Sequence, residues 1–399
     1  MSGLKLIDIL DCPTLDLTKN QRGILDVLSR NQNVRRIDVA ETLGFSPQTM
    51  MRAINPLVDL GIINEVEELS GGRGKPPRLM SVRSGALLTL GITVAEGCSI
   101  VDLTDFSGRR IARNSITKPY PNAQEQLDGV RHAIADLIKN NPPAGRIVAA
   151  AVLVQGYFLE PGKRIVGRSD PLGWSRINLH GELSEFIGLP VSLVNDGRAF
   201  AASLIGSPFN RNFIGLLLGS GIGGGIICDG RILGGATGNA GELGKFFEDG
   251  PFRPTETALL AALDLPDWSL WQGVDALTNA KHQNLNEWMT QASSAISRAL
   301  ELCIAVVDFD TVYIGSCMPE DLLEMLADKV EVKKLGIASK DAHFEIALPS
   351  PEIVAKPIAS MSLLAGRIAM KSFLEPEQFV SKTQEIPAPI NAETRKEGL

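Results

Sequence analysis

The sequence predicts an α/β protein with an N-terminal winged helix-turn-helix domain and a larger body in which strands and helices alternate. The first observation is a set of three short helical segments, followed by two strands with a basic, glycine-rich turn between them, all within residues 1–83. The second is the change after residue 84, where strand-like apolar runs alternate with segments of helical periodicity.

Length and composition are those of a globular protein with more than one domain. The 399 residues include 44% hydrophobic and 21% charged residues, enough to bury a core. No apolar run reaches the roughly 18 residues of a transmembrane helix, and the N-terminus lacks the apolar segment of a signal peptide. The five cysteines are far apart and form no C-x-x-C pair, so we expect a reduced, cytoplasmic protein without a cysteine-rich zinc site.

Charge is unevenly distributed along the chain. The net charge is −7, but residues 1–83 alone carry a net +1, so the acidity lies in the body. Residues 69–95 contain no acid and four cations. A wholly acidic balance would argue against nucleic-acid binding, whereas this polarisation leaves the N-terminal domain suited to it.

The first two helices have clear start and stop signals. Thr18 and Gln21 match a capping box ahead of an apolar stripe at residues 24–28. A second helix is expected from about residue 36 to residue 43. Gly44 should end it, because a left-handed backbone is cheapest for glycine.

The third helix is expected over residues 47–60. Ser46 would cap it and Pro47 would occupy its first position, where the missing N–H costs nothing. Pro56 lies inside it, so we expect a kink or an early end. The side chains at or near its N-terminus that suit base edges in a major groove are Ser46, Gln48, Thr49 and Arg52.

A wing should follow the third helix. Strands near residues 62–66 and 79–82 flank a glycine- and proline-rich loop. Its cations are placed to meet phosphates or a minor groove: Arg73, Lys75 and Arg78. Two alternatives remain open: a protein-interaction module with this fold, and a basic loop that is merely solvated.

The body begins with three strand-like runs and continues with alternating helices and strands. The expected strands are residues 87–94, 98–103, 110–115, 147–155, 191–194 and 311–315, and the expected helices are residues 124–139, 286–307 and 358–373. The final residues, 375–399, are polar and contain three prolines, which indicates a mobile tail.

A glycine-rich stretch, residues 219–225, satisfies the pattern of a dinucleotide fingerprint. That interpretation is rejected, because the fingerprint requires a helix next, whereas apolar residues and an Asp229-Gly230 turn signal indicate a strand and a hairpin. The loop offers backbone N–H groups to an anion at Gly219, Ser220, Gly221, Gly223 and Gly224. The alternative is a tight turn packed beneath a neighbouring lobe.

The sequence resembles the ROK family of repressors, open reading frames and sugar kinases. The segments that carry the resemblance are 171–174 (PLGW), 189–196, 219–225 and 238–244 (GNAGELG). The resemblance implies a two-lobed actin/hexokinase-like (ribonuclease H-like) body behind the winged domain. The implied DNA-binding domain is residues 1–83, and the implied first lobe is residues 84–196, completed by the helix near 358–373. The implied second lobe is residues 197–357, which carries the glycine loop and the dimerisation surface, and the tail follows at 375–399.

Departures from the family pattern argue against catalysis. Family kinases open the body with D-x-G-x-T-K, but here residues 93–98 place Thr93 and Cys98 at the acid and lysine positions. One glycine of the family's adenosine-site pair is also missing, at Ser316. The family's zinc cysteines are absent after Glu242, and Lys245 stands where its zinc-binding histidine would be. We therefore expect no catalytic residue, no metal and no cofactor.

The resemblance implies that the sugar site is better preserved. Its positions are Asp170, Asn195, Asp196, Glu242, Lys245 and Glu256. Carboxylates and amides suit the paired hydroxyls of a sugar. Asp196 stands at the position of the kinases' general base, although a carboxylate there can also simply hold a hydroxyl or cap a helix. Lys245 favours an anionic ligand or else only neutralises Glu242 or Glu248.

The sequence as a whole indicates a cytoplasmic, sugar-responsive transcriptional regulator, most simply a repressor without turnover. Its partners would be operator DNA, a small sugar or sugar derivative, and further copies of itself in a homodimer or homotetramer, with no membrane. The alternatives are an active ATP-dependent sugar kinase that carries a DNA-binding domain, and a sugar-independent regulator whose body only binds a protein or dimerises.

Overall fold

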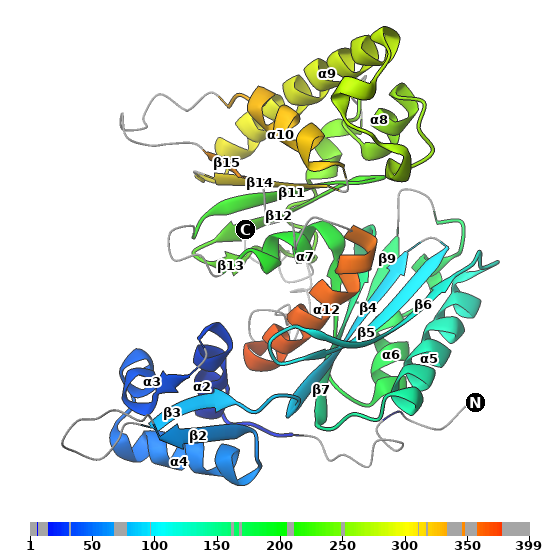
Figure 1. The fold of residues 1–399 in the computed structure, drawn as a ribbon. Helices are drawn as coiled ribbons and strands as arrows, with labels where there is room; N and C mark the ends of the chain where they lie inside the picture. The colour runs from blue at the N-terminus through cyan, green and yellow to red at the C-terminus, as the bar shows by residue number, and fades with distance from the viewer. Residues whose placement is uncertain are drawn as a thin grey trace, which may run out of the picture.

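The computed structural model describes residues 6, 15–31, 33–67, 78–95, 97–160, 163–166, 170–205, 211–248, 252–309, 311–316, 318–332, 345–347 and 357–376. A small N-terminal domain lies beside a body built on two five-stranded sheets, each in its own lobe (Figure 1). Two predicted features, the tip of the wing with Arg73 and Lys75 and the tail after residue 376, lie outside the described residues.

The N-terminal domain contains three helices and a three-stranded sheet of order β1-β3-β2. Its elements are α2 (Lys19–Arg30), β1 (Val34–Arg35), α3 (Arg36–Leu43), α4 (Pro47–Asp59), β2 (Ile63–Glu67) and β3 (Arg78–Val82). The capping box at Thr18 is formed, and Gly44 ends α3 with a φ of 64°. β2 and β3 pair antiparallel, with Ile63 opposite Val82 at one end and Glu67 opposite Arg78 at the other. This pairing confirms the predicted wing strands.

Two details of this domain differ from the sequence prediction. Of the two alternatives predicted at Pro56, a kink or an early end, the early end is wrong, since α4 continues to Asp59. Only about one turn of helix follows the proline. The backbone hydrogen bond that Pro56 cannot make is therefore close to the helix end, where losing it costs little more stability than the fraying of any helix end. The two-residue strand β1 was not predicted, because two residues carry no periodicity.

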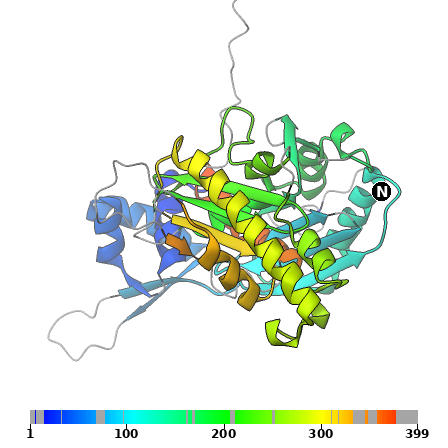
Figure 2. The same ribbon diagram turned by 90° about the horizontal axis from the view of Figure 1, so that it is seen from above.

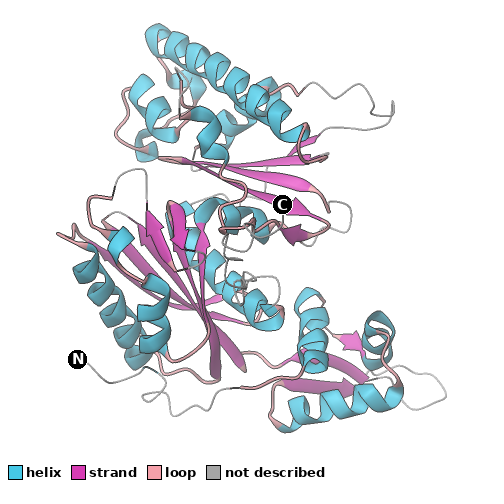
Figure 3. Ribbon diagram, turned by 180° about the vertical axis from the view of Figure 1, so that it is seen from behind, coloured by secondary structure: helices cyan, strands magenta, loops and turns pink. Residues whose placement is uncertain are grey.

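The first lobe is a sheet of order β10-β7-β4-β5-β6 with helices on both faces (Figure 3). Its strands are β4 (Leu87–Ala95), β5 (Cys98–Asp105), β6 (Arg110–Thr117), β7 (Arg146–Val154) and β10 (Val191–Asn195), and its helices include α5 (Ala123–Asn140), α6 (Leu179–Ile187) and α12 (Pro357–Leu374). The predicted three-stranded meander is confirmed by the antiparallel β4–β5 and β5–β6 pairs. β7 and β10 then extend the sheet in parallel.

Side-chain alternation along β7 explains why its residues are almost all apolar. Ala149, Ala151 and Leu153 belong to the core shared with α12, whereas Ala150 and Val152 belong to the core under α5 and α6. A strand buried on both faces needs apolar residues at every position. α12 can approach closely because Gly91 faces it: a Cβ there would lie 1.8 Å from the carbonyl oxygen of Ser362.

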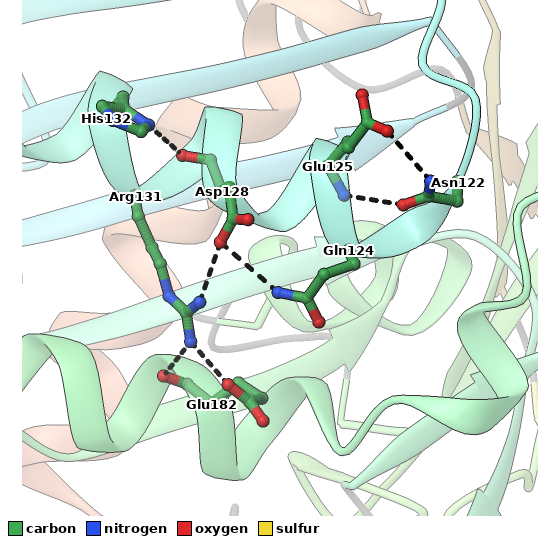
Figure 4. Close-up of polar contacts among 7 residues, drawn as sticks. All are labelled: Asn122, Gln124, Glu125, Asp128, Arg131, His132 and Glu182. Carbon is green, nitrogen blue, oxygen red and sulfur yellow. Dashed lines mark hydrogen bonds and ion pairs between the residues drawn. The ribbon is translucent and has the colours of Figure 1, made fainter. Parts of the chain in front are cut away.

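Helices α5 and α6 are joined by one arginine. Arg131 on α5 donates to Asp128 one turn earlier at 3.0 Å and to the carboxylate of Glu182 on α6 (Figure 4). Its guanidinium also lies 5.9 Å from the ring centre of Phe186. Asn122 caps the start of α5 by accepting the Glu125 N–H at 2.9 Å.

The second lobe is a sheet of order β13-β12-β11-β14-β15, crossed by the long helix α9 (Figure 2). Its elements are α7 (Asp196–Ser203), β11 (Phe213–Leu218), β12 (Ile222–Cys228), β13 (Arg231–Ile232), α8 (Glu256–Ala262), α9 (Asn279–Ile304), β14 (Thr311–Ser316), α10 (Glu320–Lys329) and β15 (Glu345–Ala347). Shorter segments complete the body: β8 (Tyr157–Glu160), β9 (Arg164–Val166) and four short 3-10 helices, Trp174–Arg176, Leu243–Phe247, Trp268–Leu270 and Val274–Ala276.

The glycine-rich stretch lies only partly between strands: residues 219–221 connect β11 to β12, whereas residues 222–225 belong to β12 itself. β11 and β12 pair antiparallel across it, and the Asp229-Gly230 hairpin follows with positive φ at both residues. The elements directly after the glycine turn are the strands β12 and β13 and not a helix, so the dinucleotide fingerprint is excluded by the fold as well as by the sequence.

Candidate functional site

The candidate effector site begins where three parallel strands of the first lobe end. Ala95, Gln155 and Asp196 follow or end β4, β7 and β10, and they line one small pocket together with Thr93. The crevice at the carboxyl ends of parallel strands is where α/β folds usually bind ligands. Gln155 is a lining residue that the sequence analysis missed, since it belongs to none of the matching segments.

Thr93 is a further polar residue of this pocket. Its side chain is buried, and its hydroxyl has no hydrogen-bond partner among the described residues. Thr93 and Asp196 line the same cavity. A neutral hydroxyl there cannot hold a divalent cation as a carboxylate would.

Asp196 and Glu242 form a pair of poorly solvated carboxyls. Burial raises the pKa of Asp196 to about 6. Burial, and then the negative charge of Asp196, raises the pKa of Glu242 to about 7, against the opposing charges of Arg198 and Lys245. Oε1 of Glu242 is buried without a hydrogen-bond partner among the described residues. Both groups are therefore suited to share protons with hydroxyl groups of a ligand.

Asp196 is positioned by close packing of α7 on the second sheet. A Cβ on Gly197 would lie 2.1 Å from the amide nitrogen of Gly224, so only glycine permits this approach. Gly223 and Gly224 thus serve packing, whereas a Cβ on Gly221 would meet nothing within 4 Å. Gly219, Ser220 and Gly221 form the turn itself, and Ser220 is exposed.

Two of the predicted effector residues already have intramolecular roles. Asn195 is buried and caps α7, because its Oδ1 accepts the Arg198 N–H at 3.1 Å and its Nδ2 donates to the Gly156 carbonyl at 2.9 Å. Asp170 accepts the Trp174 and Ser175 N–H groups at 2.7 and 3.0 Å. Burial raises the pKa of Asp170, but these hydrogen bonds outweigh it and hold the pKa below its usual value.

Lys245 belongs to a polar cluster between the lobes. Its Nζ donates to Glu248 at 2.8 Å and lies 4.5 Å from the ring centre of Tyr157. The Tyr157 hydroxyl donates to the other carboxylate oxygen of Glu248 at 2.7 Å. Tyr157 is in β8, on the first lobe, whereas Lys245 and Glu248 follow the second sheet. The pairing predicted as one alternative for Lys245, with Glu248, is present.

A second contact joins the same two segments. Asn239 accepts the Phe158 N–H at 2.8 Å and donates back to the Phe158 carbonyl at 2.9 Å. We call Tyr157, Phe158, Asn239, Lys245 and Glu248 the interlobe clasp. Glu242 lies in the chain between its two contacts, so the clasp fixes the segment that carries this carboxylate. Asn239 is in a matching segment, but nothing in the sequence indicated Tyr157.

Glu256 lies at the start of α8, close to the glycine turn. Its backbone N–H donates to the Gly219 carbonyl at 2.9 Å, and its carboxylate accepts a hydrogen bond from the Trp268 indole. This places Glu256 beside the turn and leaves its relation to a bound sugar as a prediction.

The candidate DNA-binding face is the N-terminal part of α4. Gln48 and Arg52 are exposed there. Ser46 caps the helix by accepting the Thr49 N–H at 3.1 Å, and the two hydroxyls lie 2.9 Å apart, so these residues hold each other. Arg78, at the base of the wing, is exposed and bonds Glu65 at 3.2 Å.

The described part of the chain shows neither a metal centre nor a membrane span. Within the described ranges, no three His, Cys, Asp or Glu side chains are grouped so as to hold a metal ion. The helices in the same ranges include none that is long and apolar enough to cross a membrane.

Comparison with known proteins identifies both parts of the chain. Residues 90–252 match the model of the ROK family, and residues 17–64 match the model of winged helix-turn-helix DNA-binding domains. A ROK family transcriptional regulator, a homolog of the E. coli MLC protein, has a crystal structure that superposes with a TM-score of 0.63. The match covers 89% of this chain and 98% of that one at 16% identity, which shows a common fold.

Relatives include both regulators and kinases. The uncharacterized protein y4fQ of Sinorhizobium fredii is 26% identical over 327 residues, 79% of this chain and 82% of that protein. The xylose repressor of Bacillus subtilis is 24% identical over 240 residues, 58% of this chain and 60% of that protein. The N-acetylmannosamine kinase of Salmonella typhi is 27% identical over 252 residues, 57% of this chain and 82% of that protein. The chain therefore carries a ROK family domain behind an N-terminal winged helix-turn-helix domain, in the α/β fold predicted from its sequence.

Proposed function

We propose that this protein is a DNA-binding transcriptional regulator, acting as a repressor, whose kinase-like body binds a sugar without turning it over. One observation carries the proposal: a winged helix-turn-helix domain shares a hydrophobic core with the lobe whose strand ends form the pocket beside Asp196. That arrangement gives a small ligand a physical route to the DNA-binding domain.

The effector would bind between the lobes. Asp196 and Glu242 would hold ligand hydroxyls directly, because both are half-buried and Oε1 of Glu242 has no hydrogen-bond partner among the described residues. We propose that Asp170, Asn195, Lys245 and Glu256 surround the ligand, and that the first three act largely by holding the site in shape, given their existing bonds.

The DNA partner would be a near-palindromic operator. A homodimer or homotetramer would place two copies of α4 in successive major grooves, with the wings against the backbone. A cytoplasmic location follows from this proposal, since the DNA partner lies there.

An active sugar kinase is the second candidate. It is supported by the kinase relatives and by Asp196, which stands at the general-base position. Thr93 weighs against it, because phosphoryl transfer depends on neutralising phosphate charge with a metal that this hydroxyl would not hold.

Fluorescence anisotropy tests the proposal. The purified protein is titrated onto DNA from upstream of its own gene and onto a scrambled duplex at two salt concentrations. We expect a sequence-specific excess that a sugar from a panel abolishes, and no ATP-dependent phosphorylation of the same sugars. Equal, salt-sensitive binding to both duplexes, together with phosphorylation of a sugar, would establish the kinase instead.

A further inference from the structure

One exposed face of α4 combines polar side chains with a single methionine. Gln48, Met51, Arg52 and Asn55 recur at spacings of three and four residues, so they lie on one side of the helix. The opposite side is buried in the domain core through Met50, Ala53, Ile54 and Leu57. Met51 is 41% exposed in the middle of the polar face.

Met51 is held in place by a charged cluster beneath it. Nη1 of Arg36 on α3 lies 2.6 Å from the Met51 sulfur. The Arg36 guanidinium is bound to Glu65 on β2, with Nε 3.0 Å from Oε1 and a second, shorter contact from Nη2. Glu65 also pairs with Arg78 at the wing base. Met51 is therefore an exposed apolar side chain in contact with an arginine that also binds the wing strand β2.

Base-pair edges offer an exposed apolar side chain only one apolar partner in the major groove, the C5-methyl group of thymine. We propose that Met51 is a specificity-determining residue that packs on a thymine methyl group within the operator. The inference rests on the proposed function, because it requires α4 to enter a major groove. It adds a residue that the polar pattern at the start of α4 did not indicate.

Isolated exposed apolar residues are common on protein surfaces, so a matched control is needed. Leu60, just after α4, is 42% exposed. It lies nine residues from Met51, about 180° around the helix axis. Leu60→Ala removes a similar apolar area from a surface that the proposal keeps away from DNA.

The experiment first selects a binding site from a random duplex library with the full-length protein. Each thymidine of the selected site is then replaced singly by deoxyuridine, which removes only the methyl group. Affinities are measured by anisotropy for the wild type, Met51→Ala, Met51→Leu and Leu60→Ala. For the wild type, we expect that replacing one particular thymidine in each half-site lowers the affinity about fourfold. That factor corresponds to the free energy of burying one methyl group.

The variants distinguish Met51 from other sources of this effect. Met51→Ala should bind the thymine and uracil duplexes equally, whereas Met51→Leu and Leu60→Ala should retain the wild-type difference. Circular dichroism confirms that each variant is folded. A wild type insensitive at every thymine, or a Met51→Ala protein that keeps the difference, would overturn the assignment while leaving the proposed function intact. Failure to select any sequence would overturn the proposed function, and the Met51 assignment with it.

Discussion

At the scale of single residues, the carboxyl groups of Asp196 and Glu242 make the stability of the folded protein depend on pH. Burial raises the pKa of Asp196 to about 6 and that of Glu242 to about 7, both above the values of an unfolded chain. The folded protein therefore binds more protons than the unfolded chain between about pH 4 and pH 7. The contribution of these groups to stability is greatest at the acid end of that window and is lost as pH rises through 6 and 7.

Glu242→Gln should accordingly raise the melting temperature at pH 8 and flatten its dependence on pH between 5 and 8. The amide keeps the shape of the carboxyl but carries no charge to desolvate. Thermal unfolding at several pH values measures this. Asp136→Asn, an exposed change on α5, is the control and should leave the profile unchanged. A Gln variant with the wild-type pH profile would show that Glu242 is well solvated.

Arg52 and Lys75 should affect DNA binding in different ways. Arg52→Ala is expected to relax sequence preference, by about 1–3 kcal/mol at one base position, if the guanidinium contacts a base edge. Lys75→Ala, in the wing tip, should weaken binding to all sequences similarly and reduce the slope of log affinity against log salt by about one. Anisotropy on specific and scrambled DNA at several salt concentrations distinguishes them. Equal, sequence-blind effects would count against base contact by Arg52.

At the scale of elements, the clasp should govern the mobility of the segment between residues 238 and 248. Tyr157→Phe removes only the hydroxyl that donates to Glu248 at 2.7 Å. Losing a hydrogen bond to a carboxylate should make amide exchange in this segment faster by about tenfold, with little change in global stability. Hydrogen–deuterium exchange followed by mass spectrometry reports on each peptide.

Tyr120→Phe provides a matched control for this measurement. The Tyr120 hydroxyl is buried but has no hydrogen-bond partner among the described residues. Its removal should leave exchange at 238–248 unchanged. If Tyr157→Phe behaves in the same way, Asn239 rather than Tyr157 holds this segment, and Asn239→Ala should then produce the effect.

The elements were largely predictable from sequence, but the partners of the site residues were not. Helix caps and hydrophobic periodicity are local features of the sequence. The signals at Thr18, Gly44 and Ser46 were therefore sufficient to predict where the adjacent helices begin or end. The Asn195 side chain also donates to the Gly156 carbonyl, 39 residues away, a contact that no local pattern indicates. Lys245 could be paired with Glu248 or Glu242 on spacing alone, and only the folded backbone selects Glu248.

At the scale of the whole molecule, α12 joins three parts of the structure. It packs against β4 and β7 of the first sheet, against α7, which begins at Asp196, and against α2 of the winged domain. Ile24 and Leu25 of α2 share one core with Ile368 and Ala369 of α12. A shift of α7 on ligand binding would therefore press on the helix that supports the DNA-binding domain.

Arg22 makes the polar part of the contact between α2 and α12. Its Nη1 donates to the Phe373 carbonyl at 2.9 Å, and its guanidinium lies 5.4 Å from the Phe373 ring centre. Arg22→Met keeps much of the apolar stem but removes both interactions. We expect DNA affinity without sugar and sugar affinity without DNA to remain within about threefold of wild type. The factor by which sugar weakens DNA binding should fall by about fivefold or more, because coupling between two sites is a free energy carried by such contacts.

Arg131→Met is the matched control for this substitution. Arg131 likewise donates to a backbone carbonyl, that of Glu182, and lies over a phenylalanine ring, that of Phe186. Its contacts join α5 to α6 within the first lobe. It should reduce stability without changing the coupling factor, measured as the ratio of DNA affinities at zero and saturating sugar. If Arg22→Met leaves that ratio unchanged while Arg131→Met lowers it, the signal passes through α5 and α6, and α12 serves only to hold the domains together.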